Sequence, residues 1–120
     1  MKAVVYDEYA PDDNYARILK VKDIPEPKPK PNEVVFKVKA AALNYNDIWG
    51  MRGVPVAVPL PHVSGSDAAG DVIAVGEDVT SIKVGDRVVS HSNMSCRVCK
   101  ACTDGREFDC VKRTIWGFQT

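Results

Sequence analysis

Four cysteines stand close together near the C-terminal end of this 120-residue sequence, and they are its only cysteines. Their spacing is Cys96-x2-Cys99-x2-Cys102-x7-Cys110, in a polar segment that favours turns. The two-residue gaps let three sulfurs converge from one tight loop, and the longer excursion returns the fourth. Zinc prefers such a tetrahedron of thiolates, and a closed shell leaves no position for water or substrate. We therefore predict one structural zinc, whose binding supplies on the order of 10–16 kcal/mol of local folding energy near neutral pH.

Free surface thiols, two disulfides and an iron–sulfur cluster are the alternatives for this cluster. The N-terminus turns acidic at Asp7 and carries no secretory signal, so we expect a cytoplasmic, reducing location. Thiols stay reduced there, which disfavours disulfides. Bacterial ferredoxins use the run C-x2-C-x2-C-x3-C-P, and the tail of that run is missing here. Zinc remains the predicted partner.

The composition is that of an ordinary globular protein, with 45% hydrophobic and 27% charged residues. Its length suits one domain spanning 1–120. Sixteen basic and sixteen acidic residues give a net charge of zero, and no basic stripe indicates nucleic-acid binding. No apolar run approaches the length of about 20 residues that a membrane helix needs.

Short strands separated by turns dominate the predicted secondary structure. Apolar runs and period-two alternation predict strands over 2–7, 19–24, 33–40, 70–76 and 85–90. The alternation is strictest in 33–40, where one face gathers Val34, Phe36, Val38 and Ala40. Lys37 and Lys39 should then point to water. With no long amphipathic helix and no Gly-x-Gly-x-x-Gly motif, the sequence predicts a mainly β, barrel-like domain.

The connecting segments are set by proline, glycine and asparagine. Alternating prolines make 25–31 an extended connector, with a ligand for a proline-recognising domain as the alternative. Three prolines turn 54–61 into a loop laid over an apolar surface. A short helix should follow Asn44 or Asn46 as cap, with Asp47 favourable near its positive end. We expect the glycines at 50 and 53 to end it.

The order of these motifs resembles the N-terminal half of zinc-type alcohol dehydrogenases, in the medium-chain dehydrogenase/reductase superfamily. The likeness rests on the cysteine spacing, on Gly85-Asp86-Arg87-Val88 before it, and on the proline-rich stretch that leads into strand 33–40. It implies a GroES-like β-barrel with short helices and a zinc-binding lobe at about 92–113. In the family this domain precedes a Rossmann domain that binds NAD(P). No such domain lies within 1–120, so we expect an N-terminal fragment that is inactive alone.

Two departures from the family pattern remove ligands of the catalytic zinc. Where alcohol-oxidising members carry Cys-x-Thr/Ser-Asp, this sequence has Asn44 at the cysteine position, in Asn-Tyr-Asn-Asp. Where they carry Gly-His-Glu, it has Ser66 at the histidine position, in Gly-Ser-Asp. Neutral oxygens bind zinc poorly, and a catalytic zinc usually has three good protein ligands. We therefore expect the structural zinc without a catalytic one.

The zinc-free members of the superfamily are quinone oxidoreductases and enoyl-thioester reductases, which share Asn-x-x-Asp and Gly-Ser-Asp/Glu motifs. Trp49 after the asparagines, and Ile-Trp-Gly-Phe at 115–118, resemble crotonyl-CoA and acryloyl-CoA reductases. The resemblance therefore implies NAD(P)H-dependent reduction of an activated C=C bond in a small-molecule substrate. The proton-donating tyrosine of mitochondrial enoyl-thioester reductases is missing near Val54-Pro55, so the proton comes from another donor or from water.

On this resemblance Asn44 and Asn46 are the catalytic candidates, beside the nicotinamide. Tyr45, with Asn46, would contact the cofactor, and Trp49 and Ser66 the substrate. The same asparagines could simply cap a helix, and Trp49 could belong to the core. An alcohol or polyol dehydrogenase with unusual zinc ligands is the first alternative function, and a non-catalytic zinc-stabilised binding module is the second. Family members are often dimers or tetramers, which makes a homo-oligomer an expectation for the full-length protein.

The two histidines are expected to be structural. His62 lies in a proline-flanked loop, three residues before Gly65, and we expect a hydrogen-bonding surface residue rather than a replacement zinc ligand. His91 follows the strand predicted over 85–90 and should be structural as well.

Overall fold

The computed structural model describes all residues 1–120 and consists mainly of short strands and turns. The strands are β1 (Lys2–Val5), β2 (Lys20–Asp23), β3 (Val34–Ala42), β4 (Asp67–Val75), β5 (Arg87–Val89), β6 (Asn93–Met94) and β7 (Thr114–Ile115). The helices are α1 (Tyr15–Ile18), α2 (Tyr45–Arg52), α3 (Lys100–Thr103) and the 3-10 turn η1 (Glu107–Asp109). No helix is long and apolar enough to cross a membrane. The predicted mainly β class is confirmed.

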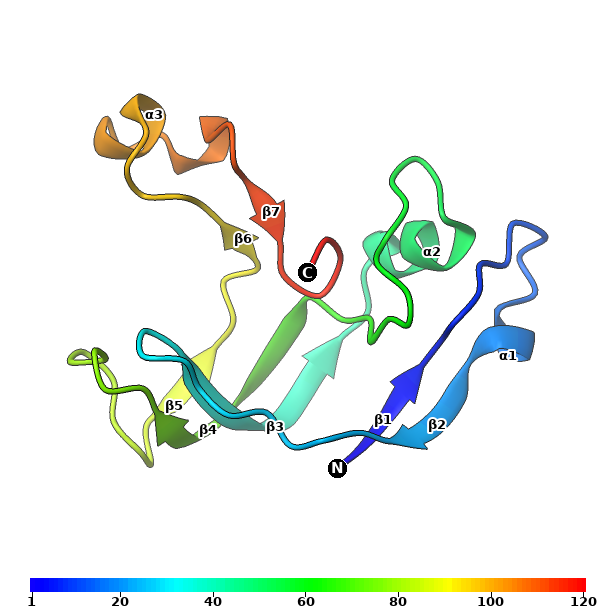
Figure 1. Ribbon diagram of the computed structural model, residues 1–120, viewed down its shortest axis with the longest axis horizontal. Coiled ribbons are helices and arrows are strands. Elements are labelled where there is room, and N and C mark those ends of the chain that lie inside the picture. Colours follow the sequence, from blue (N-terminus) through cyan, green and yellow to red (C-terminus); the bar gives the residue numbers. More distant parts are fainter.

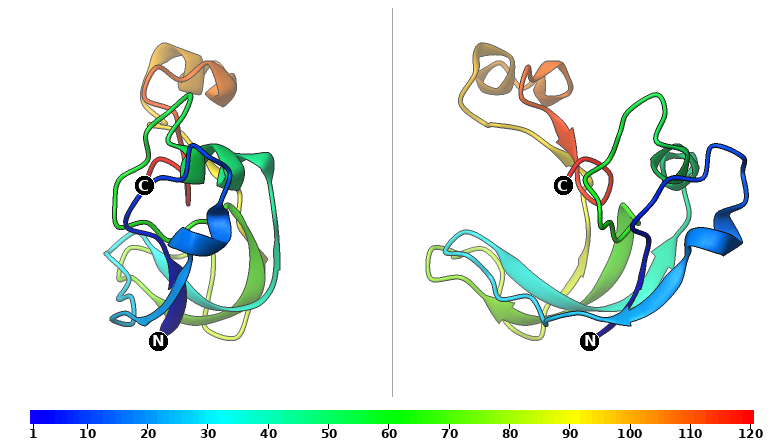
Figure 2. Two further views of the ribbon diagram at one scale, coloured as in Figure 1. Left: turned by 90° about the vertical axis from the view of Figure 1, so that its right-hand side faces the viewer. Right: turned by 45° about the vertical axis from the view of Figure 1, so that its right-hand side comes forward.

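The strands form three antiparallel ladders, in the orders β1-β2, β3-β4-β5 and β6-β7. The first two ladders follow one curved surface, as Figures 1 and 2 show. The segment from β6 to β7 projects from this body and carries α3 and η1 at its tip (Figure 1). All five strands expected from sequence are present, with bounds shifted by a few residues.

The face predicted for strand β3 is only partly correct. Its ladder with β4 shifts register between Val35 and Phe36 and again between Val38 and Ala40. The first shift places its extra residue in β4 and the second places it in β3 after Val38, so Phe36 and Val38 still share one face. Phe36 is half-buried, whereas Val38, which lies opposite Gly70, is 54% exposed.

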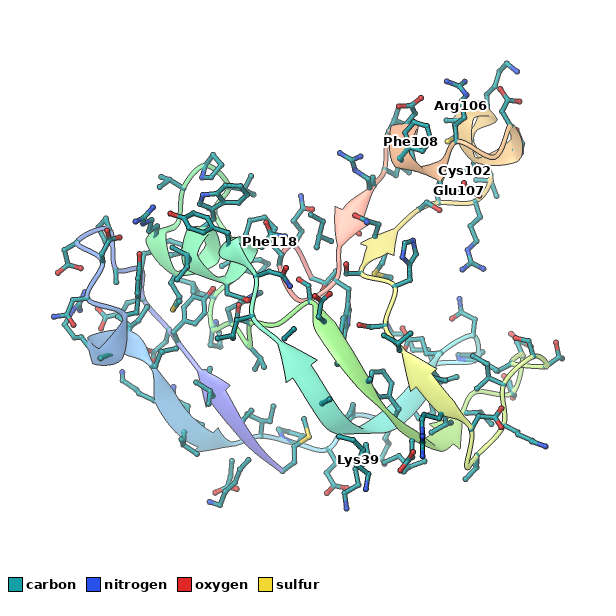
Figure 3. The ribbon with its side chains drawn as sticks, turned by 180° about the vertical axis from the view of Figure 1, so that it is seen from behind. Lys39, Cys102, Arg106, Glu107, Phe108 and Phe118 are labelled. Carbon is teal, nitrogen blue, oxygen red and sulfur yellow. The ribbon has the colours of Figure 1, made fainter.

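The core lies between β1, the two N-terminal helices and the loop that follows them. Six buried residues form one cluster: Tyr6, Ala10, Ile18, Met51, Val58 and Phe118. Val58 comes from the loop at 54–61, which covers apolar surface as the prolines predicted. Phe118 reaches the cluster from the C-terminal end and lies beside α2 in Figure 3.

His62 takes part in this packing, and the expectation of a surface residue is wrong. Its backbone exchanges two hydrogen bonds with Tyr6, at 3.0 and 2.8 Å. Its ring lies 5.4 Å from the Tyr6 ring, and Nε2 is 3.1 Å from the carbonyl oxygen of Gly117. Only 3% of the residue is exposed. The bridge to β1 and the returning C-terminal segment bury the ring, and neither was visible in the local sequence.

Helix α2 begins after Asn44, one of the two predicted caps, and ends before Gly53, whose φ of +74° suits a glycine. Gly50 lies inside the helix, so the expectation that it ends the helix is wrong. A β-carbon at Gly50 would stand 2.8 Å from the Tyr6 hydroxyl oxygen, which is buried and has no hydrogen-bond partner. Burial raises the pKa of Tyr6 to about 12, with the Asp47 carboxylate adding to the rise. Gly50 is therefore required by close packing.

Gly50→Ala should destabilise the wild-type protein but stabilise the Tyr6→Phe variant. In the wild type the added methyl collides with the Tyr6 hydroxyl oxygen, whereas its other neighbours lie at ordinary contact distances of 3.5 and 3.7 Å. Without the hydroxyl, alanine should gain its helix preference of about 0.5–1 kcal/mol over glycine. Urea unfolding of the wild type, both single variants and the double variant measures this coupling. Additive effects of the two substitutions would contradict the proposed contact.

Candidate functional site: a cysteine lobe and an asparagine-capped helix

The cysteine lobe is the projecting segment between β6 and β7. The pairing of Asn93 with Ile115 and of Met94 with Thr114 closes its base. Cys96 lies in the loop after β6, Cys102 lies in α3, and Cys110 directly follows η1. Figure 3 shows Cys102 in the lobe, far from Phe118 and the core. The segment between β6 and β7 therefore projects from the body, and the zinc lobe at about 92–113 stays a prediction.

The four sulfurs fit a tetrahedral zinc ion. All of them lie within 4.8 Å of one another. The Sγ atoms of Cys96 and Cys102 are 4.0 Å apart, and those of Cys99 and Cys102 are 3.5 Å apart. Zn–S bonds of about 2.3 Å in a regular tetrahedron require S–S edges of about 3.8 Å. The thiols therefore stand where a single ion would hold them, as the sequence spacing predicted.

The surroundings of the sulfurs divide them into two kinds. Backbone N–H groups of Val98 and Cys99 donate to the Cys96 sulfur and lower its pKa to about 6. Burial has the opposite effect on Cys102, whose pKa rises to about 11. The backbone N–H of Cys96 also donates to the Cys110 sulfur at 3.4 Å. A divalent cation at the centre would favour the thiolate form at every ligand, including the buried one.

No second cluster of metal ligands accompanies these cysteines. In 1–120 they are the only group of three or more His, Cys, Asp or Glu side chains whose ligand atoms converge. Asn44 and Asp67 do meet, with Asn44 Nδ2 donating to Asp67 Oδ2 at 2.8 Å. Ser66 lies beside Asp67 in the chain, but it is only 3% exposed and its Oγ has no hydrogen-bond partner. Around Asn44 the donor atoms are therefore the carboxylate oxygens of Asp67 and Asp47 and neutral oxygens, with no cysteine or histidine among them.

Asp47 fixes the start of helix α2. Its carboxylate is buried, with 7% of the residue exposed. Oδ2 accepts the backbone N–H of Asn44 at 2.8 Å, and Oδ1 accepts the Ser64 hydroxyl at 2.6 Å. The first bond is the returning arm of a capping box. Through Asp47, the helix start and the loop before β4 are therefore held together.

The aromatic candidates lie on the exposed side of the same helix. Tyr45 is 59% exposed and Trp49 is 39% exposed, and their rings meet edge to face at 5.4 Å. Arg52 donates to the Tyr45 hydroxyl at 3.5 Å and holds Asp13 through two bonds of 2.6 and 2.8 Å. Trp49 is therefore only partly buried in this domain. Asn46 is half-buried in the first turn.

Sequence reasoning missed three members of this arrangement. Asp47 was placed only as a favourable charge near the helix end, although an acidic residue three positions after Asn44 is itself the pattern of a capping box. Ser64 carried no local signal, and Asp67 was noted only as the last residue of the Gly-Ser-Asp motif. Their partners lie 17 and 23 residues away in the chain, so only the tertiary fold brings them together. Cofactor or substrate contacts by Tyr45, Asn46, Trp49 and Ser66 stay predictions.

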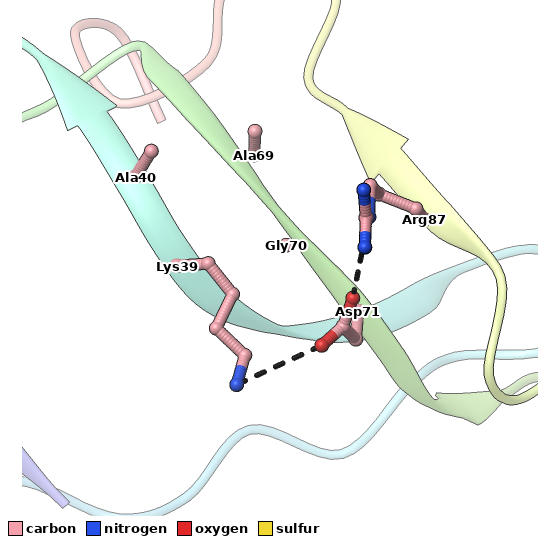
Figure 4. A pocket seen from close by; sticks show the side chains of 6 residues that line it. All are labelled: Lys39, Ala40, Ala69, Gly70, Asp71 and Arg87. Carbon is pink, nitrogen blue, oxygen red and sulfur yellow. Dashed lines mark ion pairs between the residues drawn. The ribbon is translucent and has the colours of Figure 1, made fainter.

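A pocket of about 420 Å³ lies elsewhere, on the three-stranded sheet. Asp71 on β4 forms ion pairs there with Lys39 at 3.7 Å and with Arg87 at 4.0 Å (Figure 4). The two basic side chains are 58% and 90% exposed, and pairs of this kind contribute about 0–1 kcal/mol. None of the predicted site residues lines this pocket. We therefore regard it as a solvated part of the sheet surface.

Comparison with known proteins identifies the fold. Residues 30–119 match the family described as the alcohol dehydrogenase GroES-like domain. This match covers three quarters of the chain and includes Asn44, Ser66 and all four cysteines. The chain belongs to the alcohol dehydrogenase GroES-like family. The predicted resemblance and the GroES-like fold are thereby confirmed.

Two curated relatives and one solved structure are similar over nearly the whole chain. Crotonyl-CoA carboxylase/reductase of Cereibacter sphaeroides is 38% identical over 85% of this GroES-like chain. Acryloyl-coenzyme A reductase of Metallosphaera sedula is 36% identical over 94% of it. A structure titled NAD-dependent alcohol dehydrogenase is 40% identical over 99% of it, with a TM-score of 0.88. The chain spans only 25%, 32% and 34% of these three proteins, respectively.

Cys110→Ser should abolish stoichiometric zinc binding, because three thiolates leave the tetrahedron open and Cys110 is the ligand that closes the loop. Metal analysis of protein purified without chelator should give one zinc per chain for the wild type. Val111→Ser serves as the neighbouring control, since Val111 is 86% exposed and should keep its zinc. Full zinc occupancy in Cys110→Ser, or none in the wild type, would contradict a four-cysteine zinc site.

Proposed function

We propose that this chain is the substrate-side domain of an NAD(P)H-dependent reductase of activated C=C bonds, with an enoyl thioester as the favoured substrate class. The observation that carries the proposal is the donor set around α2. On the resemblance described above, Asn44 and Ser66 stand at the positions where alcohol-oxidising members of the family have cysteine and histidine, and no group of three zinc-ligating side chains converges there. The names of the two curated relatives support the same substrate class.

The chemistry of a conjugated thioester explains why such a site needs no Lewis acid. A reduced nicotinamide, when bound, supplies the hydride that adds to the β-carbon. The π electrons then move toward the carbonyl oxygen, and the α-carbon takes a proton from another donor or from water. The negative charge of this enolate is spread over the thioester and can be held by hydrogen bonds alone. An alcohol or simple ketone lacks this delocalisation and requires a metal to polarise its oxygen.

The residues of α2 would orient such a substrate. Asn44 and Asn46 offer amide groups at the start of the helix, which Asp47 holds in place. Tyr45 and Trp49 present an exposed aromatic pair, on which a flat nicotinamide or an acyl chain can pack. Zinc in the cysteine lobe would have a structural part only, because four thiolates leave no open coordination position.

The full-length protein should oxidise NADH or NADPH in the presence of crotonyl-CoA or acryloyl-CoA. It should not reduce NAD(P)⁺ in the presence of primary alcohols or polyols, because no zinc activates the hydroxyl group. The readout is the absorbance band of the reduced nicotinamide, which would fall in the first assay and would rise in the second if alcohols were oxidised. Turnover of alcohols without turnover of either thioester would favour the alternative dehydrogenase, for which the 40% identity to an NAD-dependent alcohol dehydrogenase speaks. No turnover of any kind would favour a binding module.

A further inference from the structure

We infer that Asp67 is a positioning residue that fixes the polarity of the Asn44 amide, so that Asn44 accepts a hydrogen bond from an N–H or O–H group of the bound ligand. This inference rests on the proposed function and deepens it. It assigns to Asn44 the binding of a neutral donor, and it places the enolate oxygen elsewhere.

The contact between the two side chains sets the orientation of the amide. Asn44 Nδ2 donates to Asp67 Oδ2 at 2.8 Å, the short length of a bond to a charged acceptor. If the amide turned over, its oxygen would face the carboxylate and repulsion would replace the bond. The amide nitrogen is therefore directed toward Asp67 and the oxygen away from it.

The rest of Asn44 is fixed independently. Its backbone N–H is held by the buried Asp47 carboxylate at 2.8 Å, and Ser64 holds that carboxylate in turn. Asp67 stands at the first position of β4, paired with Ala42 at the end of β3. The backbones of Asn44 and Asp67 are therefore both anchored at the ends of regular elements, which fixes the positions from which their side chains meet.

The charge around Asn44 favours a donor over an anion. Neither Asp47 nor Asp67 forms an ion pair with any Lys, Arg or His in 1–120, so their negative charges are not locally compensated. The second N–H of Asn44 Nδ2 lies beside Asp67, and an enolate oxygen bound there would face a like charge at short range. The amide oxygen has two lone pairs, so it can support the helix cap and still accept from a ligand.

Two ligand groups have this chemistry: the carboxamide or a ribose hydroxyl of the nicotinamide nucleotide, and an amide N–H of the thioester's pantetheine arm. Two measurements distinguish them. The dissociation constant of the full-length protein for NAD(P)H, measured by nucleotide fluorescence without thioester, reports contact with the nucleotide. Its KM for crotonyl-CoA reports contact with the pantetheine arm.

The decisive variant exchanges the two side chains, Asn44→Asp with Asp67→Asn. The exchange keeps the net charge and a good helix cap, because aspartate caps as well as asparagine. It also keeps a hydrogen bond between the two side chains, now donated by residue 67 and accepted by residue 44. Residue 44 then has oxygen acceptors only. We expect the exchange variant to keep both constants within about threefold of wild type, whereas Asn44→Ala weakens one of them about tenfold, the loss expected for one hydrogen bond.

Asp67→Asn alone should weaken the same constant severalfold with little change in kcat, since an uncharged partner no longer dictates the amide orientation. Loss of binding in the exchange variant as severe as in Asn44→Ala would overturn the inference, because Asn44 would then be acting as a donor. Unchanged constants in both Asn44→Ala and Asp67→Asn would overturn it as well. NAD(P)H binding needs no turnover, so it tests the nucleotide arm even if no thioester is reduced and the proposed function fails.

Discussion

The buried carboxylate of Asp47 is the interaction on which the candidate site depends. A charge with 7% of its residue exposed is costly unless hydrogen bonds satisfy it, and here the bonds come from the start of α2 and from the loop before β4. Through Ser64 and the backbone of Asn44, Asp47 sets the distance between two segments that are far apart in sequence. The β3–β4 ladder, which pairs Ala42 with Asp67, brings Asn44 close to Asp67. The geometry of the site thus comes from this backbone pairing together with the hydrogen bonds of Asp47.

The body of the domain and the cysteine lobe are stabilised by different interactions. The body has a small apolar cluster around Tyr6 and Phe118, to which β1, α2 and the C-terminal segment all contribute. The lobe has almost no such cluster, and its largest apolar side chains, such as Phe108 and Val111, face solvent. At the proposed zinc site, convergence of the four sulfurs on one ion would replace apolar packing. A structural zinc there would be independent of the residues around Asn44.

The sequence predicted features that depend on neighbouring residues and missed those that depend on partners far away in the chain. The cysteine spacing and the Asn44 cap are local patterns, and both appear as expected. Val38 is exposed because it lies opposite Gly70, which has no side chain to cover it, and the alternating pattern of β3 carries no sign of that partner. The burial of His62 and the contact of Asp67 with Asn44 depend on partners many residues away. These features required the tertiary structure.

The proposed function requires that this fold support reduction of a conjugated thioester beside Asn44 without a second metal. Anomalous scattering at the zinc edge, from crystals of the full-length protein with NADP⁺ and a saturated acyl-CoA, tests that requirement most directly. We expect one zinc peak, among the four cysteines, and acyl-CoA density next to Asn44 with no metal between them. A second zinc peak, coordinated near Ser66 and Asp67, would contradict it.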